Sequence, residues 1–140
     1  MISAQFVAKV RAGTKRQTIR PARKHPHKVG EILDLREWKG KPYRSKQRHI
    51  IFARVTDYAP ITIFPNGFEQ DMIFTPRPSD IRRMAIADGF ANWGDLRAWF
   101  SAHYDLPFRG FLTVWEPLPE MNCRDFEKLR AEKTQPELAL

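Results

Sequence analysis

Near the start of the chain, apolar positions recur with the spacing of an α-helix. A helix is expected over residues 6–12, and Gly13 is a typical stop. Its apolar face consists of Phe6, Val7 and Val10. Residues 14–20 are mostly polar and precede Pro21, which predicts a structured loop or a short strand. Residues 21–30 lack apolar periodicity and contain prolines and basic side chains, so we expect them to be exposed and mobile.

Two adjacent helices are expected in the C-terminal half. Ser79 is the expected N-cap of a helix over residues 80–87 that stops at Gly89. Asn92 is the expected N-cap of a helix over residues 93–103, whose large apolar side chains recur at i, i+3 and i+4. These core side chains are Leu96, Trp99 and Phe100.

Short runs rich in β-branched and aromatic residues predict the strands. They cover residues 31–38, 49–55, 61–64, 68–74 and 110–115. Pro65, Asn66 and Gly67 separate the third run from the fourth, which predicts a β-hairpin. The tryptophans Trp38, Trp93, Trp99 and Trp115 are expected to belong to the core.

The order of these elements favours an α+β fold, in the form of a small mixed β-barrel with flanking helices. Pro117 and Pro119 follow the last strand, so the compact domain is expected to span residues 1–119. Residues 120–140 are expected to form a C-terminal appendage with a short amphipathic helix over residues 123–133 and a flexible tail.

Length and composition limit the class of protein. A chain of 140 residues with 42% hydrophobic residues is long enough for one domain with its own core. Its one cysteine, Cys123, cannot form an internal disulfide, and no apolar run is long enough for a membrane span or a signal peptide. We therefore expect a soluble protein of the cytoplasm without a membrane partner.

The charge is unevenly distributed along the chain. Residues 1–54 contain 15 basic and 3 acidic side chains, a net charge of +12, whereas residues 55–140 carry a net charge of −4. From Lys9 to Lys28 there are eight basic residues and no acidic one. Such a segment is typical of a surface that contacts a polyanion, although a surface that only keeps the protein soluble is the alternative.

Motifs of several enzyme classes are missing. The sequence has no P-loop and no dinucleotide-binding GxGxxG motif, so no nucleotide cofactor is expected. His25 and His27 lie close together but have no cysteine or carboxylate at zinc-site spacing, so no metal is expected. No GxSxG motif or Cys–His nucleophile is present.

One remaining motif resembles the signature of a known protein family. Residues 13–20, GTKRQTIR, resemble the GxKxxTIR signature of the ASCH family in the PUA-like superfamily. Further motifs follow in the family's order: KVGEIL at 28–33, RSKQ at 44–47, DGF at 88–90 and FRGFLTVW at 108–115. Residues 59–78 and the tail beyond Pro119 have no counterpart in the motifs. The resemblance implies a β-barrel of five or six strands with a cleft where the GxKxxTIR loop lies beside the helical DGF junction.

The resemblance also implies candidate catalytic residues. In similar small bacterial proteins the matched lysine, threonine and a downstream acid hydrolyse the amide of N4-acetylcytidine; here these are Lys15, Thr18 and Asp88. From the residues alone, the like charges of Arg16 and Arg20 favour a neutral Lys15, which could then act as a general base with Thr18 as nucleophile. Alternatively, Lys15 is an exposed phosphate ligand and Asp88 only ends a helix. Asp88 is also one methylene shorter than a glutamate.

Two hypotheses about function follow. In the first, the protein binds RNA or another single-stranded nucleic acid, and its basic cleft contacts phosphates and an unstacked base. The expected contact residues are Arg16, Gln17, Arg20, Arg23, Lys24, Tyr43, Arg44, Ser45 and Lys46. In the second, it is a hydrolase of a modified nucleoside or a ribonuclease. For Arg20 an ion pair with Asp88 is the alternative, and for residues 43–46 a solvated hairpin rim; an interaction protein acting through its tail is a third class.

Overall fold

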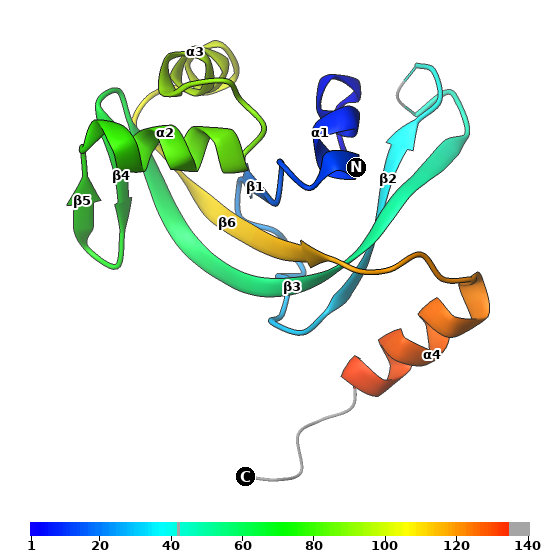
Figure 1. The fold of residues 1–140 in the computed structure, drawn as a ribbon. Coiled ribbons are helices and arrows are strands. Elements are labelled where there is room, and N and C mark those ends of the chain that lie inside the picture. Colours follow the sequence, from blue (N-terminus) through cyan, green and yellow to red (C-terminus); the bar gives the residue numbers. More distant parts are fainter. Residues whose placement is uncertain (42, 135–140) are drawn as a thin grey trace, which may run out of the picture.

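The computed structural model describes residues 1–41 and 43–134 (Figure 1). A single 3₁₀ turn, η1, covers Ala4–Phe6. The α-helices are α1 (Val7–Ala12), α2 (Pro78–Ala87), α3 (Trp93–His103) and α4 (Cys123–Thr134). The strands are β1 (Gln17–Arg20), β2 (Ile32–Trp38), β3 (Gln47–Phe64), β4 (Gly67–Gln70), β5 (Ile73–Thr75) and β6 (Phe108–Pro117). The predicted α+β class is confirmed.

The six strands form one antiparallel sheet that is organised around β3. Neighbouring strands follow the order β1-β6-β3-β4-β5, and β2 pairs with the first half of β3. β3 and β6 curve together, so that α2 and α3 lie over one half of the sheet and α1 lies beside β2 over the other (Figure 1). Among the described residues, the strand pairings do not close into a ring.

β3 is much longer than the sequence predicted. The expected strands at residues 49–55 and 61–64 are two parts of a single 18-residue strand that continues through Pro60. Pro60 falls where β3 pairs with β6 on one side only, since β2 pairs with β3 as far as Arg54 and the pairing of β3 with β4 begins at Thr62. A proline is tolerated there because its missing N–H interrupts no second ladder. A register shift between Val55 and Asp57 adds a bulge.

The predicted hairpin after β3 is confirmed, with Phe64 paired to Gly67. The expected strand at 68–74, however, is two strands, because the chain turns back at Asp71 and Met72, whose φ angles are 51° and 65°. The expected N-cap Ser79 is also wrong, since α2 already begins at Pro78 and proline fits the first turn of a helix.

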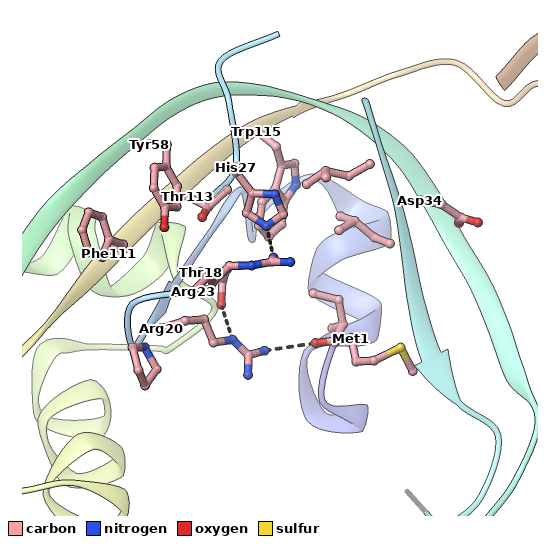
Figure 2. A pocket seen from close by; sticks show the side chains of 14 residues that line it. Met1, Thr18, Arg20, Arg23, His27, Asp34, Tyr58, Phe111, Thr113 and Trp115 are labelled. Carbon is pink, nitrogen blue, oxygen red and sulfur yellow. Dashed lines mark hydrogen bonds between the residues drawn. The ribbon is translucent and has the colours of Figure 1, made fainter. Parts of the chain in front are cut away.

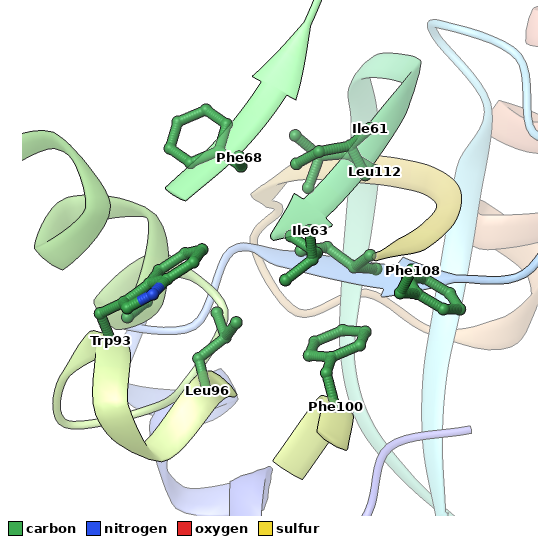
Figure 3. Close-up of a cluster of buried hydrophobic side chains, with 10 residues drawn as sticks. Ile61, Ile63, Phe68, Trp93, Leu96, Phe100, Phe108 and Leu112 are labelled. Carbon is green, nitrogen blue, oxygen red and sulfur yellow. The ribbon is translucent and has the colours of Figure 1, made fainter. Parts of the chain in front are cut away.

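Two clusters of buried side chains hold the helices on the sheet. In the larger one, Trp93, Leu96 and Phe100 of α3 point toward Ile61 and Ile63 of β3 (Figure 3). In the second, the N-terminal segment packs against β2, β3 and β6. This second cluster consists of Ile2, Phe6, Val10, Leu35, Ile50, Ala53 and Trp115. The N-terminal helix ends as predicted, with Gly13 at a φ of 80°.

The predicted C-terminal helix is present as α4, and it packs on the sheet. Phe126 is 7% exposed and stacks on Phe52, with 4.6 Å between the ring centroids. Ile32 completes this third cluster. The flexible tail predicted after the helix lies outside the described residues.

Candidate functional site

The loop that carries the GxKxxTIR motif is docked against the C-terminal end of α2. Three successive carbonyl oxygens there accept hydrogen bonds from donors in the N-terminal segment, which fix the loop beside the DGF junction. The bonds are Arg16 N–H to Ala87 O (2.9 Å), Lys15 Nζ to Asp88 O (2.5 Å) and Lys9 Nζ to Gly89 O (2.7 Å). The last carbonyls of a helix have no partner within the helix and carry its negative dipole end, so ammonium donors suit them.

Lys15 and Asp88 form a buried pair at this junction. The Lys15 side chain also donates to Gln17 O at 2.7 Å and lies over the Phe6 ring, 4.7 Å from its centroid. Lys15 is 3% exposed and Asp88 4%, so the expectation of an exposed Lys15 is wrong. The sequence did not reveal that two carbonyls, an aromatic face and a carboxylate would compensate the buried ammonium.

Burial shifts both groups of the pair toward their neutral forms. Lys15 Nζ and Asp88 Oδ1 are 4.0 Å apart. Desolvation lowers the pKa of Lys15, although the Asp88 carboxylate opposes this, and desolvation raises the pKa of Asp88 to about 6. A proton shared by two such groups moves at a smaller energetic cost than one between a free lysine and a free aspartate.

Gln17 belongs to this buried group. Its Nε2 donates to Asp88 Oδ1 at 3.4 Å and to Met84 Sδ at 2.9 Å, and the residue is 5% exposed. The structure therefore places Gln17 inside the junction, turned away from solvent. The alternative ion pair between Arg20 and Asp88 is not formed: Arg20 donates to Thr18 Oγ1 at 3.3 Å and to Met1 O at 3.0 Å.

A cavity of about 430 Å³ opens on the other side of Thr18 (Figure 2). Its inner wall is formed by buried residues, which are Ile2, Leu35, Thr113 and Trp115. Its rim carries the exposed residues Arg20, Pro21 and Arg23. Tyr58 and Phe111 form an aromatic side wall, where their rings stack with centroids 5.1 Å apart and planes at 8°. The size is typical of a site for one small ligand.

The rim of the cavity is positively charged. Arg23 Nη1 contacts His27 Nε2, and His27 Nδ1 is 2.6 Å from Glu31 Oε2. In the part of the chain that the structure describes, no carboxylate lies within 4.0 Å of Arg20 or Arg23. Their charges are therefore available to an anion that enters the cavity.

Asp34, the one acidic side chain in the lining, is compensated from outside the cavity. Its Oδ2 accepts from Arg36 Nη1 at 2.9 Å, and its Oδ1 is 2.6 Å from His49 Nδ1. The desolvation of His49 lowers its pKa, but hydrogen bonds to Asp34 and Glu120 outweigh this effect and the net pKa is raised. Asp34 therefore does not offset the charges of Arg20 and Arg23.

Thr18 lies between the cavity and the buried pair. A small pocket of about 30 Å³ adjoins the cavity and is lined by Lys15, Asp88 and Phe6. The two spaces share Ile2, Thr18 and Arg20. The structure thus brings the three candidate catalytic residues together around one small pocket, as the resemblance implied for the loop and the DGF junction.

The other expected contact residues lie elsewhere. Lys24 is exposed and outside the cavity lining, and Arg16 is exposed with its Nε bonded to Gly13 O at 2.8 Å. Residues 43–46 occupy the connection between β2 and β3, outside the cavity lining. Tyr43 is 88% exposed and its ring tilts against Trp38, while Arg44 and Lys46 are exposed. The Ser45 hydroxyl bonds within the turn: its Oγ accepts from Gly40 N–H and donates to Lys41 O.

Sequence reasoning missed the residues that line the cavity's walls. Phe111, Thr113 and Trp115 alternate along β6 and therefore share one face, as do Leu33 and Leu35 on β2. This period of two was visible in the sequence. The pattern alone could not separate a wall that faces a cavity from one that faces a core, because both consist mainly of apolar residues.

Comparison of the chain with protein-family models, with curated proteins and with solved structures finds no match. Within residues 1–41 and 43–134, no three His, Cys, Asp or Glu side chains are grouped to hold a metal ion. No helix in the same residues has the length and apolar character that crossing a membrane requires.

Proposed function

We propose that the protein binds single-stranded RNA and takes one nucleotide into the cavity. The observation that carries this proposal is the cavity itself, which combines two arginines without carboxylate partners at its rim with an aromatic wall. Arginine guanidinium groups pair with phosphate oxygens, and aromatic side chains stack on unpaired bases. A ligand with an anionic group and a flat ring fits this combination better than a purely apolar or purely anionic one.

A single-stranded RNA would contact exposed basic and aromatic side chains that a free nucleotide in the cavity would not reach. Tyr43, Arg44 and Lys46 are exposed on the β2–β3 connection, outside the cavity. They would contact a neighbouring nucleotide, with Tyr43 supplying a stacking surface and the two cations binding phosphates. The net charge of +12 in residues 1–54 supports the same conclusion, since a single phosphate needs only part of it.

The proposal includes the ASCH-type, PUA-like barrel that the resemblance implies. Two observations support it: β3 and β6 are strongly curved, and the motif loop at residues 13–20 lies against the DGF junction at residues 88–90. In a barrel of this kind the curved sheet would hold the nucleotide on its concave side. The location in the cytoplasm, where RNA is found, also remains part of the proposal.

Fluorescence anisotropy with a labelled single-stranded RNA tests the binding function. Arg20→Gln and Arg23→Gln each remove one rim charge and should weaken binding about fivefold to thirtyfold, because a charge-assisted phosphate contact contributes about 1–2 kcal/mol. Arg82→Gln is the matched control, since Arg82 is exposed on α2 and outside the cavity lining. If all three variants lost the same affinity for RNA, the loss would reflect only the net charge of the protein. The cavity would then be refuted as the binding site.

Hydrolysis of N4-acetylcytidine, or of a related amide-modified nucleoside, is the second candidate function. It is favoured by the position of Thr18 beside a lysine and an aspartate that burial makes less ionised. Neutral Lys15 would take the Thr18 hydroxyl proton as the oxygen bonds to the amide carbon. The C–N bond then breaks, the proton passes to the leaving nitrogen, and water hydrolyses the resulting ester.

Turnover of N4-acetylcytidine to cytidine, followed by chromatography, tests this alternative. The wild type should deacetylate the nucleoside, and Thr18→Val should abolish turnover while nucleoside binding persists. Asp88→Asn should lower the rate without a loss of the folded state. If the wild type gives no cytidine, the hydrolase is excluded for this substrate and the binding function is unaffected. A parallel assay for cleavage of the labelled RNA covers the ribonuclease alternative.

A further inference from the structure

One buried polar group beside the cavity has no hydrogen-bond partner among the described residues. Trp115 on β6 is 2% exposed and lines the cavity, and its Nε1 has no hydrogen-bond acceptor among the described residues. The other buried indole in the described structure, that of Trp93, donates from its Nε1 to Pro65 O at 3.1 Å. A buried N–H without a partner destabilises a protein by about 1–3 kcal/mol, so such groups are rare and need an explanation.

The residues that line the cavity are exposed at its rim and buried at its inner wall. Arg20 and Arg23 are exposed at the rim, whereas Trp115, Thr113 and Leu35 are buried in the inner wall. Figure 2 shows Tyr58 and Phe111 on one side of the two arginines and Asp34 on the other. A nucleotide in this space would have its phosphate at the rim and its base edge toward the inner wall, because the charges are outside and the apolar walls inside.

We propose that Trp115 is a specificity-determining residue that donates a hydrogen bond from Nε1 to an acceptor on the base. This inference rests on the proposed nucleotide-binding function and names the ligand class more closely: a nucleotide whose inward base edge presents a carbonyl oxygen or an unprotonated ring nitrogen. An indole N–H is a donor only, so it cannot pair with an amino group. A base that turns only an amino group inward would leave both donors unpaired and is rejected.

Two variants distinguish a hydrogen bond donated by Trp115 from the packing of its ring. Trp115→Phe removes the N–H and should lower the affinity for a nucleotide about threefold to tenfold, the effect of one neutral hydrogen bond. Trp93→Phe is the matched control: it removes an indole whose N–H is already paired, at a residue outside the cavity lining, and should leave the affinity unchanged. Ribose 5-phosphate, which lacks a base, should bind wild type and Trp115→Phe equally.

Titration calorimetry with the four ribonucleoside 5′-monophosphates and ribose 5-phosphate measures these affinities. Four tryptophans give four indole signals in a ¹H–¹⁵N spectrum, and the signal missing from Trp115→Phe assigns Trp115. A saturating nucleotide should shift that signal in the wild type, which keeps the inference testable even if the variant does not fold, with assignment then by the remaining single variants.

The outcomes distinguish the two proposals. Binding of a nucleotide to the wild type, with a shift of the Trp115 signal and a loss of affinity in Trp115→Phe but not in Trp93→Phe, supports the inference. Binding with an unchanged Trp115 signal and equal affinities overturns it and leaves the proposed function in place. If the wild type binds neither the nucleotides nor RNA, the proposed function fails, and the inference fails with it.

Discussion

At the scale of single residues, the burial of Lys15 and Asp88 is the feature with the largest physical consequence. An isolated buried ammonium or carboxylate is costly, and each group here has partners that reduce the cost: carbonyl oxygens and an aromatic ring for Lys15, the Gln17 amide for Asp88. The compensation is incomplete, because the pKa of Asp88 is still raised to about 6. The pair is therefore sensitive to pH.

Asp88 should make the stability of the protein fall between about pH 4 and pH 6. Its pKa is raised from 3.8 to about 6, so the folded state holds a proton that the unfolded state releases, and each rise in pH through this range favours unfolding. Urea denaturation of the wild type and Asp88→Asn at several pH values measures the effect. The variant's free energy of unfolding should fall less over this range. Asp105→Asn, at an exposed position, is the control and should follow the wild type.

Gly89 should not tolerate a side chain. Its φ is +100°, and a Cβ there would lie 2.7 Å from Phe6 Cδ1 and 2.9 Å from Lys15 Cδ. Gly89→Ala should therefore lower the free energy of unfolding by about 1–3 kcal/mol, which thermal denaturation detects as a lower Tm. Gly40→Ala is the control, because its nearest neighbour would be at an ordinary 3.4 Å. Equal Tm values for the two variants would contradict this account.

At the scale of elements, local signals and long-range pairing divide what the sequence could predict. The ends of α1 and α3 were predictable because Gly13 and Asn92 act within one turn of the helix: the Asn92 side chain accepts from Asp95 N–H. The continuity of β3 through Pro60 was not, because it depends on which side of the strand has a partner. The motif loop was located correctly beside the DGF junction, but the burial of Lys15 depends on contacts over 73 residues of chain.

α4 packs on the sheet through aromatic side chains, and an ionisable hydrogen bond lies beside them. His49 Nε2 lies 2.9 Å from Glu120 Oε1, just before the helix, and the His49 ring is 4.3 Å from the Phe52 ring that also stacks on Phe126. The net pKa of His49 is raised, so its charge stabilises this arrangement below pH 6.5 and the effect is lost as the pH rises through the folded-state pKa.

Amide exchange in α4 should therefore accelerate as the pH rises above about 6.5, after correction for intrinsic rates. The expected change is about twofold to fivefold, since a partly exposed ion pair contributes up to about 1 kcal/mol. His49→Gln should remove the pH dependence, and Glu120→Gln should reduce it. Exchange in α3, which has no contact with His49 in the described structure, provides the internal reference. A pH dependence that persists in His49→Gln would show that another group is responsible.

At the scale of the whole molecule, the uneven charge has a spatial meaning. The basic first half of the chain supplies β1, the loop after it and the β2–β3 connection, and these carry the cavity rim and the exposed cations around Tyr43. The acidic second half supplies α2, α3, α4 and most of the supporting sheet. A polyanion that approaches the molecule is therefore attracted to the part that contains the cavity.

RNA binding should consequently depend strongly on salt. If Arg20, Arg23, Arg44 and Lys46 each neutralise a phosphate, the logarithm of the association constant should fall with the logarithm of salt concentration with a slope of about −3. Anisotropy titrations between low and physiological salt measure this slope. Removing Arg44 and Lys46 together should reduce it to about half, while a slope near zero for the wild type would exclude a polyanion as the ligand.

The hydrogen bonds from Lys9, Lys15 and Arg16 to the end of α2 also bear on how the chain folds. They join segments 71 to 80 residues apart, so the last turn of α2 acquires its donors only after the N-terminal segment has docked. The docking of the N-terminal segment against the end of α2 should therefore be a late step of folding. A nascent chain could complete this junction only once residue 89 has emerged from the ribosome.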